Sequence, residues 1–244
     1  MSILPESTVG DVASRGPAEL EVLERLGIDY CCGGDQSLEL ACRKAGRETG
    51  AVIAALLEAE RPSAPEPEGI DWRNETLEAL TEHIERTHHS FMKRELPRAG
   101  ELMAKVRLAH GERHPELAEM AAVLDGLAGE IGAHLLKEER VLFPMIRQME
   151  ATRLVGRLHC GSVTNPIAVM EHEHESAGIA LRRLRELSRG YQPPEDACAS
   201  YRALLDSLAG IERDLHVHIH KENNILHPRA EQLEIELQAG AGGF

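Results

Sequence analysis

The sequence predicts an all-α protein, an antiparallel four-helix bundle preceded by a small helical N-terminal domain. Aromatic residues make up only 3% of the chain, while Leu, Ala, Glu and Arg are abundant, which favours helices over strands. Four long segments carry apolar residues at alternating spacings of three and four, as expected for helices with one buried face. Short connections between such helices favour an antiparallel bundle. The 244 residues are enough for one sizeable core and a small additional module.

The N-terminal domain is predicted over residues 1–60, as short helices separated by glycine. Thr8 can cap a first helix, Pro17 suits the first turn of a second, and Gly27 suits its end. The segment Asp29-Tyr-Cys-Cys-Gly-Gly is expected to be a turn, because consecutive glycines interrupt both the helical and the strand period.

Residues 61–70 are predicted to be a linker, because three prolines stiffen the segment and prevent a helix. The bundle is predicted over residues 71–244. Asp71 is expected to cap its first helix, Pro97 to kink or end that helix, and Pro228 to disturb the last one. The second helix is expected from about residue 115 to 149, the third after a loop over 152–166, and the fourth from about residue 196.

Charge and composition exclude several classes of function. The net charge of −14 argues against non-specific binding to nucleic acids or anionic membranes. No window is long and apolar enough for a membrane-spanning helix, and the N-terminus shows no secretory signal. Five cysteines, an odd number, favour free thiols in a reducing compartment. We therefore expect a cytoplasmic protein.

Two of the predicted helices carry the same interruption of an apolar face. His134 precedes Glu138 by four residues and His218 precedes Glu222 by four, so each pair shares one helix face. His174 interrupts the apolar face of the third helix in the same way. A buried glutamate is costly unless it is paired. A buried His–Glu hydrogen-bonded network would satisfy one such pair, but the repeat favours a metal ion shared by facing helices.

The first helix offers two candidate ligands, between which periodicity does not choose. His88 continues the stripe of Ile84 and Phe91, whereas His89 lines up with Met92 on a less apolar face. Imidazole nitrogens suit iron, zinc and copper, and a carboxylate can bridge two cations. Structural zinc would more often recruit thiolates, and these stripes hold none. The pattern therefore favours two iron ions bridged by carboxylates and an oxo group or water, with manganese as the alternative.

Three motifs resemble the hemerythrin-like bundle: HLLKEERVLFP at residues 134–144, EHEHESAG at residues 171–178, and the segment 218–230. The Tyr-Cys-Cys-Gly-Gly stretch ahead of them resembles the N-terminal domain of the di-iron proteins that repair iron centres. The resemblance covers nearly the whole chain. It places the first ligand at the second histidine of the helix-one pair. The ligand set that it implies is His89, His134, Glu138, His174, His218 and Glu222.

Cys31 and Cys32 are adjacent and therefore do not form the Cys-x-x-Cys motif of thioredoxins. A disulfide between adjacent cysteines is strained and easily reduced, which suits a thiol pair that exchanges electrons or passes on iron or nitrosyl groups. The alternative is that two small residues pack in a tight turn. The residues alone favour neither reading, whereas the resemblance implies the redox or transfer role.

The resemblance implies repair of iron–sulfur clusters damaged by nitrosative or oxidative stress, through the supply of iron. Iron–sulfur proteins would be the clients, and nitric oxide or oxygen the small ligand. The alternatives are nitric oxide reduction at the di-iron centre, and binding or sensing of oxygen or nitric oxide. The oligomeric state stays open, and a homodimer formed through the small N-terminal domain is compatible with the sequence.

Overall fold

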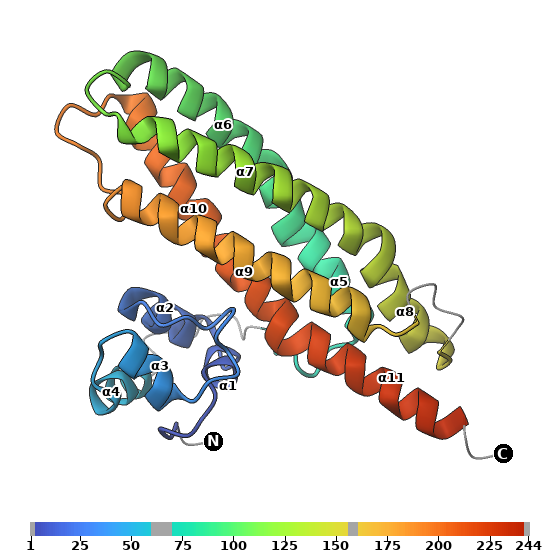
Figure 1. Ribbon diagram of the computed structural model, residues 1–244. Helices are drawn as coiled ribbons and strands as arrows, with labels where there is room; N and C mark the ends of the chain where they lie inside the picture. The colour runs from blue at the N-terminus through green and yellow to red at the C-terminus, as the bar shows by residue number, and fades with distance from the viewer. Residues whose placement is uncertain (1–2, 60–69, 156–160, 242–244) are drawn as a thin grey trace. The chain divides into compact units, whose positions relative to one another are not determined.

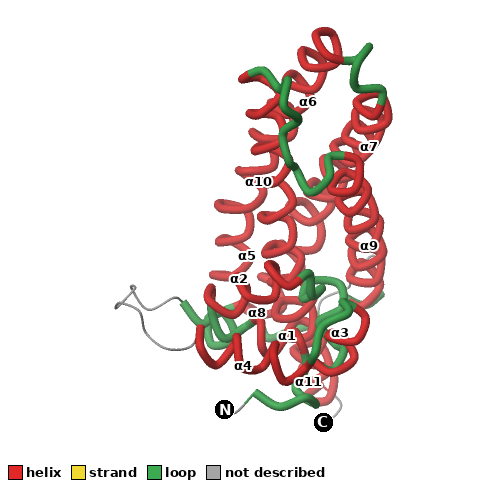
Figure 2. Tube along the Cα trace, turned by 90° about the vertical axis from the view of Figure 1, so that its left-hand side faces the viewer, coloured by secondary structure: helices red, strands yellow, loops and turns green. Residues whose placement is uncertain are grey.

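The computed structural model describes residues 3–59, 70–155 and 161–241. Helices dominate these ranges, which contain no strand beyond an isolated β-bridge between Thr8 and Ser37 (Figure 2). The predicted all-α class is confirmed. Apart from its last residue, the expected 61–70 linker lies outside the described residues. The chain divides into two compact units, Met1–Leu80 with His216–Phe244, and Thr81–Leu215.

The unit Thr81–Leu215 is a four-helix bundle, in which α6, α7, α9 and α10 run alongside one another (Figure 1). Within this unit, two of the four rods contain a short π-helical segment, labelled η. In chain order the rods are α5 (Leu77–Ile84), η1 (Glu85–His89) and α6 (Ser90–His110); α7 (Glu116–Lys137), η2 (Glu138–Leu142) and α8 (Phe143–Thr152); α9 (Thr164–Leu187); and α10 (Ala199–Lys221).

The core of the bundle is built from the apolar stripes that define the helices in the sequence. Met92, Leu124, Leu181 and Leu208, from four different helices, are each at most 1% exposed. Burying one such side chain contributes about 1.5–3 kcal/mol, so these stripes hold the four helices together.

Of the two outcomes expected at Pro97, a kink or an end of the helix, the end does not occur. Pro97 lies inside α6, flanked by the buried Leu96 and Ala99. Packing of these neighbours offsets the hydrogen bond lost at proline, which costs about 3 kcal/mol in an isolated helix. Asp71 does not cap α5 either. The hydroxyl of Thr76 accepts the hydrogen bond from the Ala79 amide instead, at 3.1 Å.

Two of the π-helical segments begin at the glutamate of a His-x-x-x-Glu motif, η2 at Glu138 and η3 at Glu222. In η2 the amide of Phe143 donates to the carbonyl of Glu138, and in η3 (Glu222–Leu226) the amide of His227 donates to that of Glu222. A proline follows immediately in both cases. Because proline has no amide hydrogen and crowds the carbonyl four residues earlier, a wider turn before it relieves the clash. The helix therefore continues past Pro228 into α11 (His227–Ala241).

The other unit contains the N-terminal helices together with the end of α10, η3 and α11. Its short helices are α1 (Val9–Ala13), α2 (Pro17–Leu26), α3 (Leu38–Lys44) and α4 (Thr49–Ala59). As predicted, the Thr8 hydroxyl caps α1, accepting from the Asp11 amide at 3.1 Å. Gly27 ends α2 with a positive φ of 70°, which glycine adopts without strain. Ile219 of α10 belongs to the same apolar cluster as these helices.

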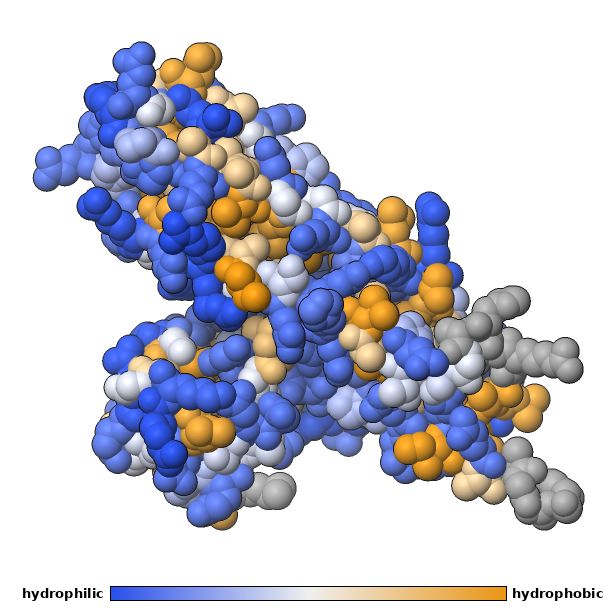
Figure 3. Space-filling view, viewed as in Figure 1, coloured by the Kyte–Doolittle hydropathy of each residue, from blue (hydrophilic) through white to orange (hydrophobic). Residues whose placement is uncertain are grey.

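The face drawn in Figure 3 is mostly hydrophilic, with apolar side chains scattered over it. Such scattered residues are normal for a globular protein and mark no interface by themselves. None of the described helices combines the length and the apolarity needed to cross a membrane.

Candidate metal centre

Four of the predicted ligands meet inside the bundle unit around the carboxylate of Glu138. The Nε2 atom of His89 lies 3.3 Å from Oε2 of Glu138, and Nε2 of His134 lies 3.2 Å from Oε1. The Nε2 atom of His174 is 3.1 Å from that of His134. All four residues are at most 2% exposed. Each oxygen of one carboxylate therefore faces a different imidazole.

Three separate rods bring these side chains together. His89 is the last residue of η1, Glu138 is the first residue of η2, His134 lies one turn earlier on α7, and His174 comes from α9. Two of the four thus lie at the boundary of a π-helical segment. Such widened turns occur frequently at functional sites because they re-aim a side chain without ending the helix.

Two further glutamates contact the outer nitrogen, Nδ1, of His89 and of His134, on the side of each ring that faces away from Glu138. The Nδ1 atom of His89 lies 2.8 Å from Glu139, and Nδ1 of His134 lies 2.9 Å from Glu173. An ionised carboxylate only accepts hydrogen bonds, so each Nδ1 carries the proton and each Nε2 presents its lone pair to the centre. This arrangement is typical of metal-binding histidines.

Each outer glutamate is also paired with a lysine, Glu139 with Lys93 at 2.6 Å and Glu173 with Lys137. Burial alone would raise the pKa of the Glu139 carboxyl, but hydrogen bonds from Lys93 and His89 outweigh it and lower that pKa. The pKa of Glu173 is lowered in the same way. Both side chains therefore stay ionised at neutral pH. The helical pattern of the sequence does not mark either glutamate, although each is adjacent in sequence to a predicted ligand.

The two histidines of the first helix have different partners. Nδ1 of His88 pairs with Asp214 at 3.0 Å, whereas Nε2 of His89 faces Glu138. Of the two histidines, the one that the resemblance implies, His89, is therefore the one that contacts Glu138.

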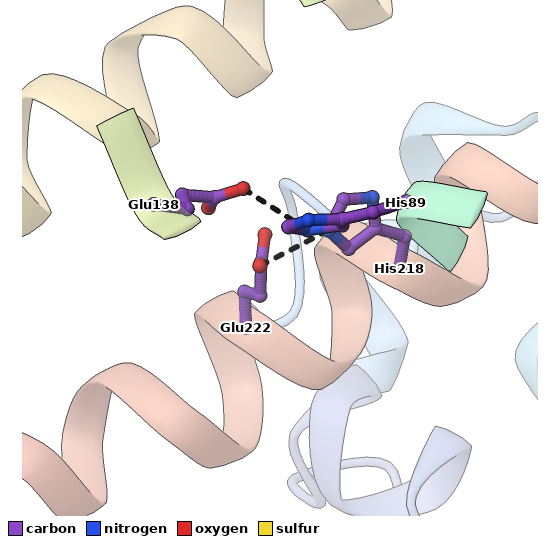
Figure 4. Close-up of side chains that lie close together, drawn as sticks. All are labelled: His89, Glu138, His218 and Glu222. Carbon is purple, nitrogen blue, oxygen red and sulfur yellow. Dashed lines mark hydrogen bonds and ion pairs between the residues drawn. The ribbon is translucent and has the colours of Figure 1, made fainter. Parts of the chain in front are cut away.

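The second His–Glu pair lies in the other compact unit. Nε2 of His218 is 3.0 Å from Oε1 of Glu222, and both side chains are at most 1% exposed. Figure 4 shows this pair and the pair of His89 and Glu138, each with a carboxylate oxygen directed at an imidazole nitrogen. His218 and Glu222 correspond to His134 and Glu138. In both pairs the histidine lies on an α-helix and the glutamate is the first residue of a π-helical segment.

The donor atoms fit a metal ion in both spacing and kind. Ligands at about 2.1 Å from a metal and at right angles to one another lie about 3 Å apart. The separations of 3.0–3.3 Å within each pair match this value. Nitrogen and carboxylate oxygen donors suit iron, manganese and zinc. These buried histidines and glutamates can therefore bind a metal ion.

The cysteine pair lies in a turn that is organised by Asp29. One carboxylate oxygen of Asp29 accepts hydrogen bonds from the amides of Cys31, Cys32 and Gly33, at 3.2, 3.0 and 3.2 Å. The two sulfur atoms are 3.8 Å apart, and no disulfide joins the two cysteines. The contact with Cys32 and burial raise the pKa of the Cys31 thiol well above its ordinary value, so this thiol is protonated at neutral pH.

This turn packs on the helix that carries the second His–Glu pair. Asn223 donates to the carbonyl of Cys31 at 3.3 Å, and Asn224 donates to the carbonyls of Tyr30 and Cys31 at 3.2 and 3.3 Å. Both asparagines directly follow Glu222 in η3. No signal in the sequence marks this contact, because an off-stripe polar side chain on a helix usually faces solvent. The predicted loop residue Cys160 lies outside the described residues.

Comparison with known proteins gives two family matches. Residues 80–230 match the hemerythrin HHE cation binding domain, and residues 5–60 match a domain of unknown function, DUF542. Among the relatives, the iron-sulfur cluster repair protein YtfE of Pectobacterium carotovorum is 33% identical over 225 residues, 92% of this chain and 96% of that protein. YtfE of Musicola paradisiaca is 34% identical over the same shares. A probable iron-sulfur cluster repair protein of Haemophilus influenzae is 32% identical, over 92% of this chain and 96% of its own.

The matched hemerythrin region contains all six predicted ligands, and the second matched region contains the cysteine turn. The fold, the buried His–Glu clusters and the extent of these matches agree with one another. The chain belongs to the family of iron–sulfur cluster repair proteins that combine a hemerythrin HHE cation binding domain with an N-terminal DUF542 domain.

Proposed function

We propose that this protein restores iron–sulfur clusters damaged by nitric oxide or oxidants, and that it supplies iron from a carboxylate-bridged pair of iron ions. The ions would be held by His89, His134, Glu138, His174, His218 and Glu222. The observation that carries the proposal is the position of Glu138, whose two oxygens each face a different histidine. The relatives named as cluster repair proteins support the client class, iron–sulfur proteins, and cysteines that form no disulfide suit the cytoplasm.

Bound here, iron would provide both an exchangeable cargo and open positions for nitric oxide or oxygen. Glu139 and Glu173 hold the histidine lone pairs in place. Neutral imidazoles and carboxylates bind iron less firmly than the thiolates of a cluster site. The donor set therefore favours transfer of iron from this protein to a client that offers cysteines.

Iron transfer to a cluster protein is the direct test of this proposal. The iron-loaded protein, mixed with a cluster-free client, sulfide and a thiol reductant, is expected to rebuild the client's visible absorption. The His174→Gln variant is expected to transfer much less iron, because a ligand at the centre is lost. The exposed His172, two residues earlier on α9, gives a matched control in His172→Gln. Equal transfer by both variants would contradict the proposal.

The assignment of His89 is tested by replacing each histidine of the pair separately. His89→Gln is expected to weaken iron binding at least tenfold, a loss typical of a disturbed metal site, and so to lower the iron content. His88→Gln is expected to retain the iron and to lower only the thermal stability, because it breaks the contact with Asp214. Iron content by elemental analysis and unfolding by circular dichroism separate the two effects. Iron loss in His88→Gln alone would overturn the assignment.

A second candidate function, reduction of nitric oxide, is favoured by the packing of Cys31 and Cys32 on the helix of His218 and Glu222. Two nitric oxide molecules would take two electrons and two protons to give nitrous oxide and water. Oxidation of the two thiols to a disulfide supplies both electrons and both protons. Repeated consumption of nitric oxide in the presence of a thiol reductant, lost in a Cys31→Ser/Cys32→Ser variant, would support this function over iron supply.

A further inference from the structure

A second cluster of metal-ligating side chains lies in the bundle unit, apart from the six proposed iron ligands. It consists of His110 at the end of α6, His114 in the loop that follows, and Asp196 in the segment before α10. Their ligand atoms all lie within 4.8 Å of one another. Two histidines and one carboxylate with an open fourth position form a common type of zinc site.

Asp196 faces two imidazoles in this cluster, as Glu138 does in the proposed iron centre. Its Oδ1 atom lies 3.0 Å from Nε2 of His114, and its Oδ2 atom lies 3.9 Å from Nδ1 of His110. One carboxylate thus faces two imidazoles from different turns of the chain.

The outer nitrogen of His114 is held by a glutamate. Nδ1 of His114 lies 3.0 Å from Glu116, which, when ionised, can only accept a hydrogen bond. Nε2 of His114 lies 3.0 Å from Asp196 in the same way, so a metal ion bound between them would take the place of the proton on Nε2. The pairs His89–Glu139 and His134–Glu173 show the same arrangement. Fixing of the outer nitrogen by a carboxylate is typical of a metal-binding histidine.

His110 directs a nitrogen lone pair toward the centre of this cluster. The guanidinium of Arg113 lies 3.4 Å from Nδ1 of His110, and because it can only donate, Nδ1 is the acceptor. Arg113 also lies 2.9 Å from Oδ2 of Asp196. A cationic side chain therefore already occupies the place of a metal ion. The Arg113 side chain is 61% exposed, so it can turn outward into water.

Tyr201 fixes the two imidazole rings from the α10 side. Its ring packs against those of His110 and His114, with centroids 5.4 and 5.6 Å away. His110 is 5% exposed, whereas the side chain of Asp196 is 37% exposed. The cluster thus has one rigid, buried wall and one side open to solvent, through which an ion can enter.

We propose that His110, His114 and Asp196 form a second metal site, which binds zinc and from which the ion displaces the guanidinium of Arg113. The fourth ligand is water, as expected for a site open to solvent. The bound ion joins the end of α6, its loop and the start of α10. The site does not depend on the proposed iron centre, because the two share no residue.

Zinc binding to the iron-loaded, full-length protein without a purification tag tests this proposal. Zinc is titrated against a chromophoric chelator, and one zinc ion per chain is expected in addition to the iron. Binding is expected to weaken at least tenfold in Asp196→Asn and in His114→Gln, a loss typical of a disturbed metal site. Arg113→Gln removes the competing cation and is expected to strengthen binding several-fold.

His172→Gln is the control, because this exposed histidine on α9 lies in the same unit and outside the cluster. Iron is measured in the same samples, so loss of zinc with unchanged iron belongs to this site alone. If Asp196→Asn folds poorly by circular dichroism, the gain in Arg113→Gln still tests the site. Zinc binding that is absent, or that changes in none of the three variants, overturns the proposal.

Discussion

Replacing Glu138 with glutamine is expected to remove iron from the protein while leaving its helices intact. The two carboxylate oxygens lie 3.3 and 3.2 Å from the histidine nitrogens that would share the ions with them. The amide of glutamine carries no charge, and its nitrogen is a donor that cannot ligate a cation. The substitution would therefore leave one oxygen donor and no negative charge where the carboxylate would serve both ions, and iron affinity should fall by much more than the tenfold typical of a change outside the ligand shell.

Metal analysis and the near-ultraviolet absorption of the purified protein measure this effect. Glu130→Gln is the matched control on α7, since its carboxylate contacts the hydroxyl of Ser176 at the surface. That control should bind iron as the wild-type protein does. Full iron content in Glu138→Gln would rule out the proposed bridging role.

In the metal-free protein, the same substitution is expected not to lower the thermal stability. Glu138 is fully buried, and burying an ionised carboxylate costs more free energy than burying an amide of the same shape. Without metal, Glu138→Gln is therefore expected to be at least as stable as the wild type. With iron, the wild type gains the stabilisation that comes from binding a ligand to the folded state, and the variant does not. A variant that merely misfolds would be less stable in both conditions.

Local signals in the sequence predict the elements well where one residue decides the outcome. Thr8 and Gly27 mark helix ends through their own hydroxyl and backbone freedom, and the structure has both. The helical period likewise predicts which faces are apolar, and His134 and Glu138 stand out because they interrupt one. These are short-range effects, which a single sequence contains.

Features that depend on packing between distant segments are not predicted. Pro97 does not end its helix, because burial on both sides of it outweighs the local preference. His110 is buried against Tyr201, about ninety residues later in the chain. Glu173 looks like an ordinary surface charge until the fold brings it to His134. The proposed ligands could therefore be picked out from the sequence, while the residues that contact their outer nitrogens could not.

Replacing Gly34 with alanine is expected to displace the cysteine turn from η3. A Cβ atom at Gly34 would lie 1.9 Å from Oδ1 of Asn224, which no real contact tolerates. The Asn224 side chain would have to rotate away, and its hydrogen bonds to the carbonyls of Tyr30 and Cys31 would be lost. Losing these bonds and repacking the turn should cost about 2–3 kcal/mol of unfolding free energy.

Thermal unfolding and the rate of alkylation of Cys31 measure this change, because the thiol is 5% exposed and should become accessible. Gly100→Ala is the control, since a Cβ atom there meets nothing within 4 Å and alanine is favoured in helix α6. Removing the clashing side chain gives a sharper test. If contact with Asn224 is the cause, Gly34→Ala should add little to an Asn224→Ala variant, so that the two effects are strongly non-additive. Full additivity would mean that the glycine is needed for another reason.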